Sequence, residues 1–149
     1  MSLFSALSVS ASGMSAQRTR AELLTENLAN AETTRTPEGG PYRRKDAVFA
    51  TEFTASPFAS VFEAQQSAIP GAAPQGVGIA DIVVDNQEPE RRYIPGHPDA
   101  DAQGYVAFPR VNPAEDMVDL LGAARGYEAN VAAIAAIKDM ITRSIDLLR

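Results

Sequence analysis

The chain has 149 residues, enough for one domain with a sizeable core, and its 45% apolar and 21% charged residues are typical of folded protein. Its formal net charge of -6 argues against nucleic acid or an anionic membrane surface as the main partner, because either would select a basic face. The sequence has no cysteine, which excludes disulfides, thiolate metal sites and cysteine nucleophiles.

The N-terminal segment MSLFSALSVSASGMSAQRTR is a poor match to a secretory signal. Serines interrupt its apolar residues, and no charged segment precedes them. We therefore expect any export to use another route. The apolar run VAAIAAI at 131–137 is far shorter than the roughly 20 residues that cross a bilayer, so no membrane-spanning helix is expected.

A heptad pattern in the first 31 residues predicts a helix over about 3–30. Ser10 and Gln17 are its weak positions, so this helix should need a partner to be stable. The apolar residues of the two seam positions are Leu7, Met14, Ala21 and Leu28, with Leu3, Leu24 and Ala31 beside them.

The middle of the chain contains most of the prolines and glycines. The low-complexity tract AQQSAIPGAAPQGVG at 64–78 is expected to be an exposed loop. Runs rich in β-branched and aromatic residues predict strands over 78–85, 91–94 and 104–108. We expect a small hairpin-like insert here.

A second, stronger heptad pattern predicts a helix over about 113–148. Asn112 can cap it, Pro113 suits its first position, and Glu115 can complete a capping box. Asp116 and Asp119 lie near its positive end. Its seam positions are Met117, Ala124, Val131 and Ile145 on one side, and Leu120, Tyr127, Ile134, Ile141 and Leu148 on the other, with Lys138 the one polar member.

These patterns predict a mainly α fold in which long N- and C-terminal helices form a coiled coil, with a small irregular, β-containing insert between them. Residues 1–31 and 111–149 would form the helical core, and 32–110 the insert. A helix on the order of 50 Å long is more than a compact domain of this size needs. Its many small residues favour packing between several chains over a two-helix hairpin that closes on itself, and heptads alone do not decide between them.

A calcium loop is the most tempting chemical site. In HPDADAQGYVAFPR, Asp99, Asp101, Gln103 and Gly104 match positions 1, 3, 5 and 6 of such a loop, but Arg110 stands at position 12, where a bidentate glutamate is needed. The alternative is a tight turn in which Asp99 and Asp101 accept hydrogen bonds from backbone amides.

The sequence contains no phosphate-binding glycine loop and no nucleophile elbow, so we expect neither enzymatic activity nor a cofactor. The competing hypothesis is a metal-binding module built on the only histidine and nearby carboxylates. Its candidate ligands are Asp81, Asp85, His97, Asp99 and Asp101.

Three motifs resemble those of the axial proteins of the bacterial flagellum, most closely the proximal rod proteins. They are NLANAETTRTPEGGPYRRKD at 27–46, PGHPDAD with GYVAFPRVNP at 95–113, and EDMVDLLGAARGYEANVAAIAAIKDM at 115–140. The chain departs from the family pattern at Ile94, Asp101 and Gly126. The resemblance covers nearly the whole chain apart from about 50–78.

The resemblance implies a structural subunit of the flagellar basal-body proximal rod. Its terminal helices would pair and pack with those of neighbours around the export channel in the periplasm, after export without a cleaved signal peptide. The implied partners are other copies of the chain, other rod proteins of the proximal and distal rod, the MS-ring/rod junction protein and the type III export apparatus. No nucleic acid or small-molecule substrate is implied. The alternative is another flagellar rod or hook subunit.

Residues 27–49 would then be the hinge where the N-terminal helix ends and the chain turns outward. Asn27 and Asn30 could bond to the turning backbone, and the arginines could pair with acidic neighbours. The residues expected at subunit interfaces are Leu7, Met14, Leu24, Leu28, Asn30, Arg35, Arg43, Arg44, Met117, Leu121, Tyr127, Asn130, Val131, Ile134 and Ile141.

Overall fold

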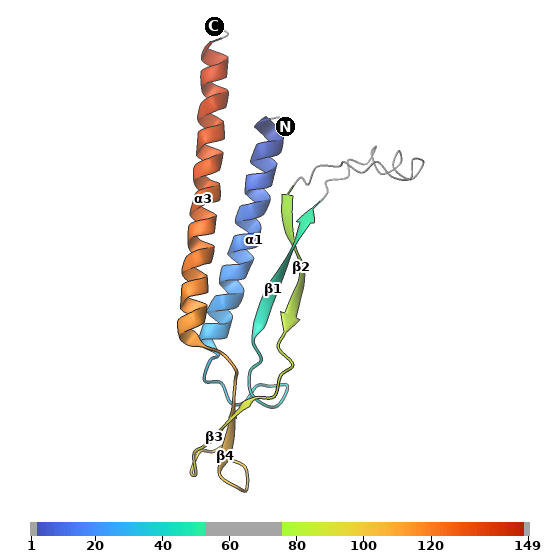
Figure 1. Cartoon of the computed structure of the whole chain (residues 1–149), viewed down its shortest axis with the longest axis vertical. Helices are drawn as coiled ribbons and strands as arrows, with labels where there is room; N and C mark the ends of the chain where they lie inside the picture. Colours follow the sequence, from blue (N-terminus) through green and yellow to red (C-terminus); the bar gives the residue numbers. More distant parts are fainter. Residues whose placement is uncertain (1–2, 53–75, 148–149) are drawn as a thin grey trace, which may run out of the picture. The chain divides into compact units, whose positions relative to one another are not determined.

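The computed structural model describes residues 3–52 and 76–147, as two long helices with four strands between them in sequence (Figure 1). None of the helices in these two stretches is long and apolar enough to cross a membrane. The elements, in chain order, are α1 Leu3–Ala29, β1 Lys45–Glu52, β2 Gly76–Val84, β3 Glu90–Tyr93, β4 Tyr105–Phe108 and α3 Pro113–Asp146.

The chain divides into two compact units, each containing part of α1 and part of α3. The first unit comprises Met1–Gln17, Phe49–Ala80 and Gly126–Arg149. The second comprises Arg18–Val48 and Asp81–Arg125. The expected division at residues 31 and 111 stays a prediction.

Both long helices were predicted, and α3 begins as its capping signals indicate. The side-chain Oδ1 of Asn112 accepts a hydrogen bond from the amide of Ala114 at 3.2 Å, and its carbonyl accepts one from the amide of Asp116 at 3.0 Å. Pro113 takes the first position, where a missing N–H costs nothing. Glu115 and Asp116 place negative charge in the first turn, and Arg143 places positive charge in the last.

In the first unit, α1 and α3 approach closely at two glycines. A Cβ on Gly13 of α1 would lie 2.9 Å from Oδ1 of Asn130, and one on Gly126 of α3 would lie 3.1 Å from Cδ of Gln17. These two contacts show that the helices run antiparallel here. Nδ2 of Asn130 donates to the carbonyl of Gly126 at 2.8 Å, which holds its amide over Gly13.

The second unit contains most of the fully buried side chains. Leu23 and Leu24 of α1, Val106 of β4 and Ala123 of α3 are its buried apolar residues within these elements. The buried polar residues are Asn27 and Asp116, at 0% and 1% exposure. An ion pair of 3.4 Å between Arg20 and Asp119 joins α1 to α3 in this unit.

The four strands form two separate two-stranded sheets, β1 with β2 and β3 with β4. Strands β3 and β4 are antiparallel, with Glu90 opposite Phe108 and Tyr93 opposite Tyr105. The Tyr93 and Tyr105 rings meet edge to face with centroids 5.4 Å apart, a favourable cross-strand pair. In the first unit, the amide of Val77 in β2 donates to Oγ of Ser12 in α1 at 3.0 Å.

The predicted fold class was wrong on strand content. The strands expected over 78–85, 91–94 and 104–108 correspond to β2, β3 and β4, but the eight-residue β1 was not predicted. Its residues are mostly exposed, so KDAVFATE lacks the apolar alternation of a half-buried strand. Of the tract predicted as a loop, 76–78 belongs to β2, and 64–75 lies outside the described residues.

The predicted coiled coil was also wrong, because the described part of the chain does not show its seam. Met117, Val131 and Ile145 are 52%, 45% and 58% exposed. On α3 the residues that face inward each come one residue before a predicted seam position; they are Asp116, Ala123, Asn130 and Ile137. On α1, Gly13 and Asn27 likewise come one residue before a predicted seam position, and they are buried together with Ser10 and Leu24.

This shift has a physical cause. One residue along a helix corresponds to about 100° around its axis, so the apolar line Met117, Val131 and Ile145 of α3 faces a different direction from the observed contact line. On α1, the seam positions Ser10 and Leu24 are buried. Glycine and small or polar residues let the backbones approach closely, and Asn130 fills the space over Gly13. The contact line therefore depends on residue size and hydrogen bonding as well as on hydrophobicity, since Leu24, Ala123 and Ile137 are buried.

Candidate functional site: the hinge after α1

Helix α1 ends at a turn that Asn30 stabilises. Nδ2 of Asn30 donates to the carbonyl of Glu26 at 3.0 Å, and the same carbonyl accepts the Asn30 amide at 3.1 Å. Its Oδ1 accepts a hydrogen bond from the Thr33 hydroxyl at 3.1 Å, and its carbonyl accepts one from the Thr33 amide at 3.0 Å. Asn30 therefore fixes the direction in which the chain leaves the helix.

The following loop folds back on itself at two glycines. Gly39 and Gly40 have φ values of 91° and 81°, a region that side-chain-bearing residues rarely adopt. The amide of Thr36 donates to the carbonyl of Gly40 at 2.8 Å, and the amide of Tyr42 donates to the carbonyl of Thr33 at 3.0 Å. These bonds close the loop and return Tyr42 to the end of α1.

The fully buried Asn27 side chain holds the returning chain against α1. Its Oδ1 accepts hydrogen bonds from the Tyr42 hydroxyl at 2.9 Å and from the Lys45 amide at 3.0 Å. Its Nδ2 donates to the carbonyl of Lys45 at 2.9 Å. One amide thus pairs with both backbone groups of Lys45, as a neighbouring strand would, and sets where β1 begins.

Charges around Tyr42 reinforce this contact. Nζ of Lys45 forms an ion pair with Glu26 at 2.5 Å and lies 5.8 Å from the centroid of the Tyr42 ring. Burial raises the pKa of Tyr42 to about 12, and the negative charges of Glu26 and Asp116 add to the effect. The phenol is therefore held neutral as a hydrogen-bond donor.

A buried ion pair connects the hinge to the start of α3. Nη2 of Arg44 lies 3.0 Å from Oδ1 of Asp116 and 3.4 Å from Oδ1 of Asp46. The Asp116 side chain is 0% exposed, yet neither of its oxygens accepts a hydrogen bond from the described residues. Burial raises the pKa of Asp116, and Asp46, Asp119 and Glu115 raise it further, while Arg44 lowers it. The pair costs desolvation that one arginine only partly offsets.

Asp99 joins the hinge loop to the turn after β3. Its Oδ2 accepts a hydrogen bond from the Thr34 hydroxyl at 2.8 Å, and its Oδ1 lies 3.7 Å from Nη1 of Arg35. Oδ1 of Asp101 accepts hydrogen bonds from the amides of Gln103 and Tyr105, both at 2.9 Å. The motifs at 27–46 and 95–113 therefore meet in the folded chain, and Asp101 acts as the turn residue that the sequence predicts.

The candidate metal ligands do not converge in the described residues. Oδ1 of Asp81 and of Asp85 each accept a hydrogen bond from a nearby backbone amide, and Nδ1 of His97 accepts one from the amide of Asp99 at 3.2 Å. No group of three or more histidine or acidic side chains in this part of the chain is placed to hold a metal ion. Asp85 and His97 therefore stabilise turns, and Asp81 bonds within β2.

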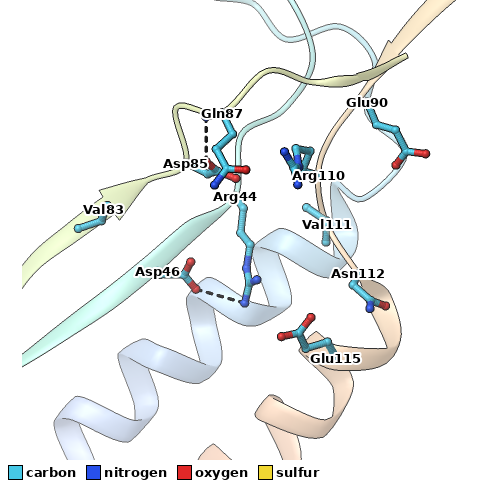
Figure 2. A pocket seen from close by; sticks show the side chains of 10 residues that line it. All are labelled: Arg44, Asp46, Val83, Asp85, Gln87, Glu90, Arg110, Val111, Asn112 and Glu115. Atoms are coloured by element: carbon cyan, nitrogen blue, oxygen red, sulfur yellow. Dashed lines mark hydrogen bonds and ion pairs between the residues drawn. The ribbon is translucent and has the colours of Figure 1, made fainter. Parts of the chain in front are cut away.

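A polar hollow of about 590 Å³ lies beside the Arg44 ion pairs in the second unit, and Figure 2 shows the side chains around it. Two arginines and four carboxylates dominate its lining. The lining residues are Arg44, Asp46, Val83, Asp85, Gln87, Glu90, Arg110, Val111, Asn112 and Glu115.

The residues expected at subunit interfaces fall into two groups. Those partly or fully buried within the chain itself are Leu7, Met14, Leu24, Leu28, Asn30, Arg44, Asn130, Ile134 and Ile141. Those exposed are Arg35, Arg43, Met117, Leu121, Tyr127 and Val131. Nη1 of Arg43 donates to Oδ1 of Asn86 at 2.8 Å. Their role in contacts between subunits stays a prediction.

Three important residues were not predicted from the sequence in the roles that they have. Tyr42 is a buried hydrogen-bond donor to Asn27, Asp116 is a buried ion-pair partner, and Asp99 binds the hinge loop. From local sequence, Asp116 in the first helical turn is predicted only to interact with the helix dipole. The only sequence signal of the burial of Asp116 was its spacing, since it shares a heptad position with Ala123, Asn130 and Ile137.

Comparisons with known proteins identify the class to which this arrangement belongs. A family model described as "Flagella basal body rod protein" matches residues 7–35, and one described as "Flagellar basal body rod FlgEFG protein C-terminal" matches 102–147. The first segment covers most of α1 and the start of the hinge, and the second covers β4 and all of α3. The chain is a structural subunit of the bacterial flagellar basal-body rod, and it assembles with other rod components.

Full-length relatives define the particular family. Proteins named "Flagellar basal-body rod protein FlgC" are 38% identical in Borreliella burgdorferi, 40% in Bacillus subtilis and 37% in Escherichia coli O6:H1. The matches cover 100%, 99% and 99% of this chain and 99%, 99% and 98% of those proteins. The chain belongs to the FlgC family of flagellar rod proteins.

Proposed function

We propose that the chain packs against neighbouring rod subunits through apolar side chains that α3 leaves exposed in each unit. In the second unit, Met117, Val118 and Leu121 are 52%, 68% and 61% exposed. In the first unit, Tyr127 and Val131 are 42% and 45% exposed. This exposure is the observation that carries the proposal, because a helix that met only water would not keep so many large apolar residues on its outer side.

Small residues beside these side chains support close packing of another helix. A Cβ built on Gly122 has no atom within 4 Å, so the surface next to Leu121 is open within the chain. Burying an exposed leucine contributes about 1.5–3 kcal/mol, and several such residues in one contact are enough to offset part of the entropy lost on association. Contacts of this kind, between different faces of successive subunits, build filaments rather than closed dimers.

The finer details of the proposal follow from the family resemblance. We infer that the chain belongs to the proximal rod, lies in the periplasm around the export channel, and reaches it through the type III export apparatus without a cleaved signal peptide. Its neighbours would be further copies, other proximal and distal rod proteins, and the MS-ring/rod junction protein. Its role would be structural, without a catalytic step.

The test replaces an exposed apolar residue of each unit with aspartate, as Leu121→Asp and Val131→Asp, in a strain that lacks the native chain. We expect both variants to be exported but at least tenfold depleted from isolated basal bodies, with loss of swimming. Because both side chains are exposed within the chain, far-UV circular dichroism of the purified variants should match the native protein.

Ala102→Asp provides the matched control, since Ala102 is exposed in the turn before β4 and is not on a helix. It should enter basal bodies at the native level. Native levels of Leu121→Asp and Val131→Asp in basal bodies would refute the proposed contact surface.

A further inference from the structure

We propose that two glycine–amide contacts hold α1 and α3 in a single register in the first unit. Gly13 and Gln17 of α1 face Asn130 and Gly126 of α3, so each helix supplies one glycine and one amide side chain. We call these four residues the register lock. The lock determines how far α1 is displaced along α3, and it does not depend on the proposed contacts between rod subunits.

The first argument is the reciprocity of the four residues. On each helix the amide follows the glycine by four residues, as Gln17 follows Gly13 and Asn130 follows Gly126. Residues with this spacing lie on the same side of an α-helix, about 6 Å apart along its axis. Because the helices are antiparallel here, the glycine of each helix lies opposite the amide of the other. Both contacts therefore specify the same register.

The second argument is how closely each amide lies over its glycine. A Cβ on Gly13 would lie 2.9 Å from Oδ1 and 3.1 Å from Cγ of Asn130, and one on Gly126 would lie 3.1 Å from Cδ of Gln17. Ordinary contacts between carbon atoms are longer, at roughly 3.5–4.0 Å. The Asn130 amide is also held in place, because its Nδ2 donates to the carbonyl of Gly126 at 2.8 Å. Even a methyl group is therefore too large opposite these amides.

A slide of one helical turn would lose both contacts. A displacement of α1 by four residues in one direction would place Ile134 opposite Gly13 and would bring the amides of Gln17 and Asn130 together. A displacement in the other direction would place Asn130 opposite Val9 and the two glycines opposite each other. The first arrangement is crowded, and the second leaves a gap between the helices, so neither packs as well as the observed register.

The third argument is that Gln17 is a costly residue if its role is stability alone. Its Oε1 is buried and has no hydrogen-bond partner among the described residues. A buried acceptor without a donor destabilises the folded state, and an alanine here would avoid that cost. Polar residues inside paired helices can select one register at the expense of stability. The presence of Gln17 at this contact is therefore explained by register.

The test measures the register in the purified full-length chain with two spin labels. The sequence has no cysteine, so Ala11→Cys and Ser144→Cys provide the only two labelling sites. Both residues are exposed, and one lies on each helix of the first unit. The pairing of Gly13 with Asn130 places them at different levels along the helix axes, so a slide of four residues, about 6 Å, changes the distance between the labels.

The labelled chain is compared with Gln17→Ala, Asn130→Ala and the variant with both changes. Glu128→Ala is the matched control, because Glu128 is an exposed residue of α3 in the first unit, two positions before Asn130. We expect a single distance in the native chain and the control. In the double variant, at least about a quarter of the molecules should show a second distance, while the melting temperature stays within about 5 °C of the native value. A single, unchanged distance in the double variant would overturn the inference.

Alanine at each glycine gives a second measurement that does not rely on the labels. Gly126→Ala should raise the melting temperature in a Gln17→Ala background but not in the native chain, because the added Cβ then occupies the space left by the amide. Gly13→Ala should do the same only in an Asn130→Ala background. Equal effects of each glycine substitution in both backgrounds would overturn the inference.

The two proposals can fail separately. If the label distances shift as expected while Leu121→Asp and Val131→Asp enter basal bodies at native levels, the register lock stands and the proposed contact surface fails. If both aspartate variants are depleted while the double variant keeps one unchanged distance, the contact surface stands and the register lock fails.

Discussion

Removing the Asn27 amide is the most direct test of how the hinge is built. Asn27→Ala deletes three hydrogen bonds, to the Tyr42 hydroxyl and to both backbone groups of Lys45. Each such bond contributes about 1 kcal/mol net, and buried groups left without a partner cost more. We therefore expect the free energy of unfolding to fall by about 3–4 kcal/mol, a large share of the roughly 5–15 kcal/mol typical of a domain.

The assay is urea unfolding of the purified chain followed by far-UV circular dichroism. Asn86→Ala is the control, since Asn86 is exposed and accepts a single hydrogen bond from Arg43, so its loss should cost less than about 0.5 kcal/mol. Tyr42→Phe should cost about 1 kcal/mol, and much less in an Asn27→Ala background, because the bond it breaks is already gone. A cost below about 1 kcal/mol for Asn27→Ala, or full additivity with Tyr42→Phe, would refute the reasoning.

Two further predictions concern the titration of Tyr42 and the glycines of the helices. Because the folded state holds the Tyr42 proton to about pH 12 and the unfolded state releases it near pH 10.0, the free energy of unfolding should fall by about 2–3 kcal/mol across this interval, a loss that Tyr42→Phe should lack in urea titrations. Gly122→Ala should raise the free energy of unfolding by about 0.5–1 kcal/mol, because its Cβ meets no atom within 4 Å and alanine favours a helix. Gly13→Ala should bring no gain, because its Cβ would lie 2.9 Å from Oδ1 of Asn130, which is held by its bond to Gly126. Equal gains for both alanine variants in thermal melts would show that the helices do not meet as described.

Local signals predicted the helices and turns well. Asn112 and Pro113 mark the start of α3, and Asn30 marks the end of α1, because caps act within a few residues of the chain. The turn role of Asp101 was likewise readable from its spacing to the following amides. The hinge motif itself indicated the flagellar rod family, which the full-length relatives confirm.

Features that depend on distant contacts were not predictable in the same way. Strand β1 is mostly exposed, so its sequence lacks the alternation that a buried face would impose. The hydrogen bond between Thr34 and Asp99 joins residues 65 positions apart, and neither segment has a sequence pattern that predicts the other as its partner. The hollow likewise depends on β1, β2 and the start of α3 coming together.

The sequence by itself determined two long helices, the breaks between them, the hinge and the family, because periodicity, capping and turn chemistry act over short stretches of chain. Only the tertiary structure decided which side of each helix is buried, since a shift of one residue turns the face by about 100°. It placed Asn130 over Gly13 and paired Arg44 with Asp116, where hydrophobic patterning pointed to Met14, Met117 and Val131. Close backbone approach and buried hydrogen bonding set that rotation, and both depend on what the facing element presents.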